Sequence, residues 1–87
     1  MMSAKVIRCS ESLAKRKRVR MLLSERSRVL VVRAGFEAYS EGYLDQAAWT
    51  ARTRAKLETE FSSVWLTLVV QFVLPILLKW IIDNWST

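Results

Sequence analysis

The chain has 87 residues, of which 52% are hydrophobic, and its 14 Lys and Arg against 8 Asp and Glu give a net charge of +6. It contains no His and a single Cys, so the sequence offers neither an internal disulfide nor the ligand set of a zinc site. Only two Gly and one Pro are present, which leaves no glycine-rich phosphate loop and favours an all-α protein over one with strands and tight turns. We expect no enzyme and no cofactor, because no Ser or Cys has a plausible base and the carboxylates lie among basic residues.

Residues 1–10 are predicted to form an N-terminal tail, in which Cys9 is an idle or buried thiol. The segment is not expected to be a secretory signal, because the basic run that follows leads to only three apolar residues, at 21–23. A helix is expected to begin near Glu11, capped by Ser10 or Ser12.

This helix contains the run KRKRVR, in which consecutive basic side chains point in all directions around the helix axis. Such a collar can bind anionic lipid headgroups or the phosphates of nucleic acid, and the alternative is a solvated segment. No aromatic residue interleaves the run, so any contact with nucleic acid is expected to be nonspecific. The residues predicted to bind an anionic surface are Lys15, Arg16, Lys17, Arg18, Arg20, Arg26 and Arg28.

Residues 11–60 as a whole are predicted to form a basic amphipathic helical hairpin. Large side chains recur at heptad spacing before Gly42, and Gly42 is suited to end a helix in a left-handed conformation. Gly35 within the first helix permits the close approach of a neighbour. The second helix carries a face of mostly small residues on which the first is expected to pack. The packing residues are predicted to be Leu22, Val29, Val32, Phe36 and Tyr39 on the first helix and Leu44, Ala48, Ala51 and Ala55 on the second.

Residues 61–85 are predicted to form a transmembrane helix, followed by a tail at 86–87. No charged residue occurs from 61 to 78. Residues 64–82 would extend about 28 Å as a helix, close to the roughly 30 Å hydrocarbon core of a bilayer. Amphipathic side chains near both ends of this segment are expected to anchor it at the membrane interfaces, namely Trp65, Lys79, Trp80 and Trp85. The alternative is a buried helix in an oligomer, since the chain is expected to hold too few other apolar residues to cover such a helix alone.

Pro75 interrupts this segment, because it has no backbone N–H to donate to the carbonyl of Gln71 and is therefore expected to kink the helix. Thr67, Gln71 and Pro75 recur at a spacing of four and share one face, where we predict a helix–helix contact within the membrane. The alternative is that this weakly polar stripe faces lipid. The helix that begins near Gln46 has no breaker before this segment and is expected to run on into the membrane, with Ser62 and Ser63 at the boundary.

Together these features predict a single-pass, tail-anchored membrane protein whose N-terminal segment lies on the cytoplasmic or inner side, because the flanking basic residues precede the hydrophobic segment. Its membrane would be a virion internal membrane or a bacterial inner membrane. The expected function is a non-enzymatic structural or assembly anchor that holds an anionic surface, a protein shell or a genome against the membrane, as a minor membrane protein of a membrane-containing virion would. The alternatives are a phage-type lysis or pore-forming protein and an accessory subunit of a multi-span complex. The expected partners are the lipid bilayer, other chains of a larger assembly, including copies of this one, and anionic lipid or nonspecific nucleic acid.

Overall fold

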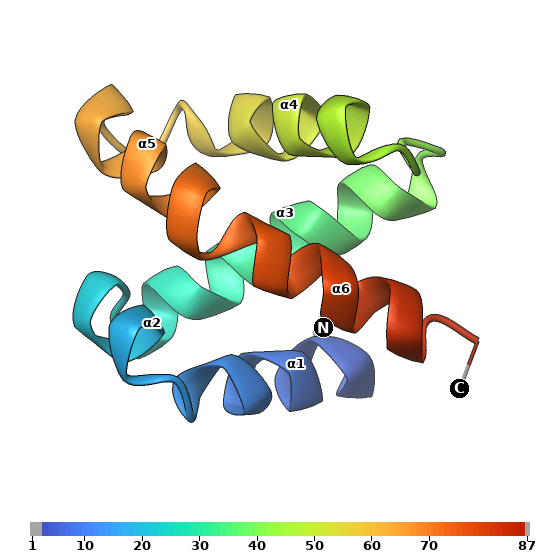
Figure 1. Ribbon diagram of the computed structural model, residues 1–87, viewed down its shortest axis with the longest axis horizontal. Helices are drawn as coiled ribbons and strands as arrows, with labels where there is room; N and C mark the ends of the chain where they lie inside the picture. Colours follow the sequence, from blue (N-terminus) through green and yellow to red (C-terminus); the bar gives the residue numbers. More distant parts are fainter. Residues whose placement is uncertain (1–2, 87) are drawn as a thin grey trace.

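The computed structural model describes residues 3–86, and within them the chain forms helices and no strand, which confirms the all-α prediction. Residues 1 and 2 of the predicted N-terminal tail and Thr87 of the C-terminal tail lie outside the described residues. Helix α3 runs through the middle of the molecule, with α1 and α2 on one side of it, α4 and α5 on the other, and α6 crossing over it (Figure 1). The helices are α1 (Ala4–Ala14), α2 (Lys17–Leu22), α3 (Glu25–Ser40), α4 (Gln46–Leu57), α5 (Ser63–Phe72) and α6 (Leu74–Asn84).

Side-chain caps determine where four of the helices begin. Ser3, Ser24, Asp45 and Ser62 each have extended backbone, and each accepts a hydrogen bond from the backbone N–H three residues later. Such a bond satisfies one of the amide donors that a helix start leaves without a partner. Because Ser62 starts a new helix, α4 does not continue into α5, contrary to the expectation of one unbroken helix.

The N-terminal residues are helical and packed, which corrects the expected tail over residues 4–10. Val6, Cys9 and Leu13 are buried on one side of α1, which lies against α3. Ser10 caps no helix; its hydroxyl donates to the carbonyl of Val6 at 2.9 Å, inside α1. The capping residue is Ser3, so the helix begins seven residues before the predicted start near Glu11.

Helices α3 and α4 form an antiparallel hairpin whose turn lies at Gly42. This residue has a φ of 100°, which strains any residue with a side chain. The Gly42 N–H donates to the carbonyl of Tyr39 at 3.1 Å, and the N–H of Tyr43 donates to the carbonyl of Ala38 at 3.2 Å. These two bonds are the Schellman arrangement that ends a helix at a glycine.

The face of α4 that packs against α3 is not the predicted one. Leu44, Ala48, Ala51 and Ala55 are all exposed, and α4 instead buries Trp49, Thr53 and Leu57. The physical reason is side-chain size, because burying one indole removes far more apolar surface from water than burying several methyl groups. On α3 the prediction agrees better with the structure: Val32 is fully buried, and Val29, Phe36 and Tyr39 are half-buried. Leu22, predicted on the same helix, is half-buried but ends α2.

Gly35 marks the point where α3, α4 and α6 meet. A Cβ atom at this position would lie 2.7 Å from Cδ2 of Leu77 and 2.9 Å from Cζ2 of Trp49, closer than real carbon atoms approach. The indole N–H of Trp49 donates to the carbonyl of Gly35 at 2.9 Å. Both α4 and α6 therefore approach α3 closely at Gly35, in agreement with the close approach predicted there.

The C-terminal hydrophobic segment is bent and is not one helix. Within residues 3–86 no single helix is both long enough and apolar enough to cross a bilayer; α5 and α6 reach that length and composition only together, and their axes differ by 49°. The break lies at Val73, two residues before Pro75. Proline is tolerated in the first turn of a helix, where its missing N–H has no role, and it therefore begins α6 instead of continuing α5.

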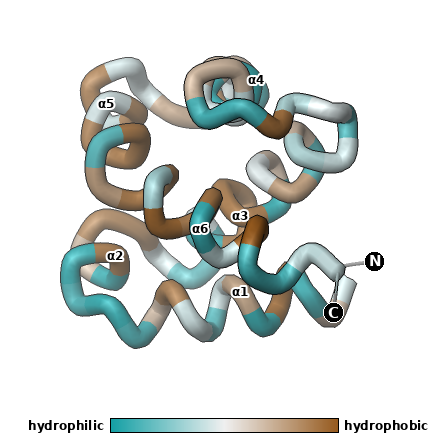
Figure 2. Tube along the Cα trace, turned by 45° about the vertical axis from the view of Figure 1, so that its right-hand side comes forward, coloured by the Kyte–Doolittle hydropathy of each residue, from teal (hydrophilic) through white to brown (hydrophobic). Residues whose placement is uncertain are grey.

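One side of this helix pair is covered by the rest of the chain. Figure 2 shows hydrophobic stretches of α3, α5 and α6 meeting near the centre of the molecule, and a hydrophilic edge where α1 leads into α2. The expectation that the chain holds too few apolar residues to cover this segment is wrong for that side, since α1, α2, α3 and α4 all contribute contacts to it. The buried residues are Leu66, Val69, Val73, Leu74, Leu77, Leu78 and Ile81.

Candidate anionic-surface binding site

The predicted basic residues gather where the end of α1, the whole of α2 and the start of α3 meet, and we call this region the basic end (Figure 1). Two short turns bring these residues together, one between α1 and α2 and one between α2 and α3. All seven side chains are exposed except that of Arg28, which is half-buried. The basic end comprises Lys15 and Arg16 in the first turn, Lys17, Arg18 and Arg20 on α2, and Arg26 and Arg28 on α3.

No carboxylate neutralises these seven cations within residues 3–86. The ion pairs of this part of the chain all join α4 to α3, or lie at the end of α4 itself. The two acidic residues nearest in sequence, Glu11 and Glu25, form no ion pair with the basic end. Its positive charge is therefore available to a partner outside the described chain.

Three of the arginines are held in place by groups that leave their charge intact. Arg20 donates to the carbonyl of Ala14 at 2.9 Å, which satisfies a carbonyl at the end of α1. Arg28 donates to the carbonyl of Leu23 at 3.0 Å. The guanidinium carbon of Arg18 lies 4.9 Å from the ring centre of Phe72. These contacts position the three arginines without neutralising their positive charge.

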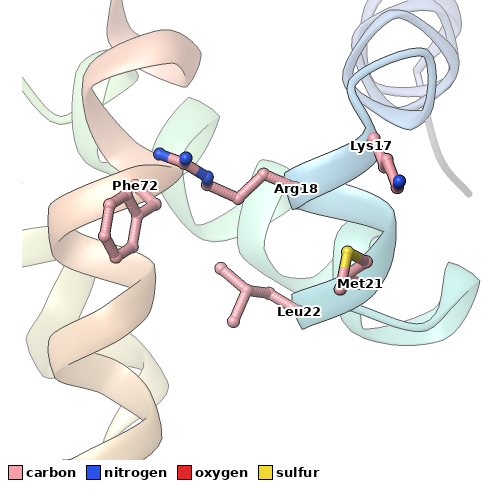
Figure 3. Close-up of a pocket in the computed structure, with 5 residues that line it drawn as sticks. All are labelled: Lys17, Arg18, Met21, Leu22 and Phe72. Carbon is pink, nitrogen blue, oxygen red and sulfur yellow. The ribbon is translucent and has the colours of Figure 1, made fainter.

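An open groove of about 580 Å³ lies between α2 and the end of α5, bordered by the basic end. Figure 3 shows Arg18 reaching over Phe72 and Leu22 pointing toward the same gap, with Lys17 and Met21 on the side of α2 away from Phe72. Met21 is 76% exposed, a large fraction for an apolar side chain. The groove therefore combines an apolar floor with two cations, and no acidic residue lines it.

Of the four residues predicted to lie at membrane interfaces, the three tryptophans contact other parts of the described chain. The indole N–H of Trp65 donates to the carbonyl of Leu22 at 3.2 Å, and its ring stacks on Phe61 at 4.2 Å between centres. Trp80 is half-buried, and the exposed Trp85 lies 4.7 Å from Tyr39 between ring centres. Lys79 is exposed. Their interfacial role stays a prediction.

The predicted polar stripe of Thr67, Gln71 and Pro75 lies on the exposed side of α5 and α6. The Thr67 hydroxyl donates to the carbonyl of Ser63 at 2.9 Å, within its own helix. All three residues are exposed, and their proposed contact with another helix stays a prediction.

Sequence reasoning missed an ion-pair cluster that joins α3 to α4. Glu41 contacts Arg52 at 3.0 Å and Lys56 at 2.8 Å, and Lys56 also contacts Glu37 at 3.4 Å. Hydrogen bonds from Lys56, and then from Arg52, lower the pKa of Glu41 below its ordinary value. The sequence signal was the matching spacing: Glu37 and Glu41, like Arg52 and Lys56, are four apart and lie on facing sides of an antiparallel hairpin.

Cys9 offers no reactive site. It is fully buried in the core, and burial raises the pKa of its thiol to about 12, so the thiolate is scarce at neutral pH. Within residues 3–86 no group of His, Cys, Asp and Glu side chains is placed to hold a metal ion.

Comparison of the chain with protein-family models, curated proteins and solved structures found no match. The features of this chain that bear on its function are the basic end, the groove beside it and the bent helix pair.

Proposed function

We propose that this chain is a non-enzymatic, membrane-associated structural or assembly protein, in which the basic end binds the anionic surface of a bilayer and α5–α6 forms the membrane anchor. A membrane-containing particle is one assembly that such a protein would serve. The observation that carries the proposal is the set of seven clustered cations without a carboxylate partner in the described chain.

Electrostatic attraction and exposed apolar side chains together favour a lipid bilayer as the anionic partner. Each basic residue near an anionic bilayer contributes about 1 kcal/mol, and this attraction weakens as salt shortens the screening length. Exposed apolar side chains support the same partner, because Met21 is at the basic end, and Val64 and Ile82 are exposed on α5 and α6. A bilayer provides both headgroup charge and acyl chains for these two kinds of side chain.

The anchoring part of the proposal is supported by the composition of α5 and α6, which together meet the length and hydropathy of a broken span or re-entrant segment. Polar residues on their outer side, Thr67 and Gln71, would then meet another helix. This part predicts that the protein stays in the membrane fraction during carbonate extraction. Release into the carbonate supernatant would contradict the anchor and leave surface binding to be tested separately.

The surface-binding part is tested with two variants of equal charge. The first changes Lys15, Lys17 and Arg18 to Gln, and its control changes Arg52, Arg54 and Lys56 to Gln; both lose three positive charges. Removing three surface contacts should cost roughly 3 kcal/mol, or about a hundredfold in affinity for anionic vesicles. The control should bind nearly as well as the natural chain, because α4 pairs its cations with its own and α3 carboxylates.

Cosedimentation with phosphatidylglycerol vesicles over a salt series measures this difference, and circular dichroism checks that both variants remain helical. Equal losses in the two variants, or binding that ignores salt, would contradict the proposal. Duplex DNA provides a parallel arm, since stronger binding to DNA than to vesicles would make nucleic-acid phosphate the partner.

A further inference from the structure

We infer that the groove between α2 and α5 is a binding site for a single anionic phospholipid, with Arg18 holding the phosphate, Lys17 adding positive charge at the opposite edge, and Met21, Leu22 and Phe72 contacting the acyl chains. This inference rests on the proposed function and adds a defined lipid site to a surface that would otherwise attract lipid only through its net charge.

In the described residues the two cations of the site have no hydrogen-bond or ion-pair partner, and Arg18 contacts Phe72. The guanidinium carbon of Arg18 lies over the ring of Phe72, 4.9 Å from its centre, and a guanidinium in such a contact keeps its N–H groups for hydrogen bonds elsewhere. Within residues 3–86 no hydrogen bond or ion pair uses the side chains of Arg18 or Lys17. A phosphate can therefore accept hydrogen bonds from Arg18 without breaking its contact with Phe72.

The apolar half of the site exposes hydrophobic surface beside these cations. Met21 is 76% exposed, and the half-buried Leu22 and Phe72 complete the floor (Figure 3). The volume of about 580 Å³ lies within the range of roughly 300–1,000 Å³ common for small-molecule sites. An acyl chain on this floor would remove Met21 from water, which neither inorganic phosphate nor a nucleic-acid backbone can do.

A second groove differs from the α2–α5 groove in the charge of the residues that line it. Between α3 and α4, a groove lined by Arg33 and Lys56 also contains Glu37 and Glu60, so its cations face carboxylates. The groove at Arg18 has cations alone. Charge complementarity therefore selects an anionic lipid for the α2–α5 groove and not for the other.

The test measures the binding of soluble lipids by titration calorimetry, each kept below its micelle-forming concentration. The probes are dihexanoyl phosphatidylglycerol, dihexanoyl phosphatidylcholine and glycerol 3-phosphate. The natural chain should bind phosphatidylglycerol at least roughly tenfold more tightly than the other two, because only this probe has both a net negative charge and acyl chains.

Two substitutions and two controls locate the site. Arg18→Gln and Met21→Gln should each weaken phosphatidylglycerol binding by roughly fivefold or more. Arg33→Gln removes an equal charge and Leu44→Gln an exposed apolar side chain, yet both should leave binding unchanged, because neither residue lines the groove or belongs to the proposed membrane anchor. All four positions are exposed, so the variants should fold.

Equal binding of glycerol 3-phosphate and phosphatidylglycerol, or equal effects of Met21→Gln and Leu44→Gln, would overturn the lipid site. If the chain still binds vesicles in a salt-dependent manner, the proposed function stands without this groove. If vesicle binding itself is absent, the proposed function fails and the site fails with it.

Discussion

The α3–α4 hairpin and the α1–α2 segment are both rich in basic residues, yet they use them in opposite ways. On α4, Arg52 and Lys56 pair with Glu41, which directly follows α3, and Arg54 pairs with Glu58, which directly follows α4. The basic residues around α2 pair with no carboxylate in the described chain. The same residue types thus hold two helices together in one region and leave a charged surface in the other.

The two regions also differ in packing. The hairpin is joined at Gly35 and Trp49 by a fully buried contact, and its turn at Gly42 has defined geometry. Helix α2 has six residues and buries only Val19 among them, a length at which a helix depends on its neighbours for stability. The comparison indicates that folding stability resides in the hairpin and that binding resides in the α1–α2 segment.

The largest effect on this comparison should come from Trp49→Ala. Removing a fully buried Trp costs about 3–5 kcal/mol, and here it also removes the hydrogen bond from the indole N–H to the carbonyl of Gly35. The matched change in the other region, Met21→Ala, should alter stability by less than about 0.5 kcal/mol, because Met21 is exposed. Urea denaturation followed by circular dichroism measures both values. Similar losses for the two variants would mean that stability is not concentrated in the hairpin.

A smaller loss is expected for Gly35→Ala. In an open helix this change would stabilise by about 1 kcal/mol, but the added Cβ meets Leu77 and Trp49 at under 3.0 Å. Overpacking of this kind costs about 1–3 kcal/mol, so the net change should be destabilising. Arg33→Ala, on an exposed position of the same helix, serves as the control for propensity. A more stable Gly35→Ala protein in the same denaturation experiment would show that the three helices can separate without cost.

The smallest effect concerns pH and the ion pairs of the hairpin. Because Lys56 and then Arg52 lower the pKa of Glu41, its contribution to stability is present above its ordinary pKa of 4.5 and is lost as pH falls through the lower pKa of the folded state. Glu41→Gln should therefore reduce the free energy of unfolding at pH 7 and make little difference once pH falls below the folded-state pKa. Glu60, which has no ion pair within residues 3–86, provides the control variant Glu60→Gln. Urea midpoints measured from pH 3 to pH 7 test this, and a Glu41→Gln effect that does not change with pH would contradict it.

Several local features could be read from the sequence because they depend on residues close together in the chain. The scarcity of Gly and Pro predicts helices, Gly42 predicts the turn of the hairpin, and Pro75 predicts an interruption in the hydrophobic segment. The start of α1 was missed although its signal is also local. Ser3 caps it, whereas the predicted start near Glu11 rests on Ser10 or Ser12 as the cap.

By itself the sequence determined that this protein is helical, that its positive charge precedes its hydrophobic segment, and that Gly42 and Pro75 divide its helices, since each property follows from composition or from neighbouring residues. Only the tertiary structure decided which face of α4 is buried, because that depends on Trp49 meeting Gly35 fourteen residues away. It also decided that one side of α5–α6 is covered by the same chain and that the cations of α4 are neutralised while those around α2 are not. Burial and charge pairing are relations between distant segments, and heptad spacing or local hydropathy carries no information about which segments meet.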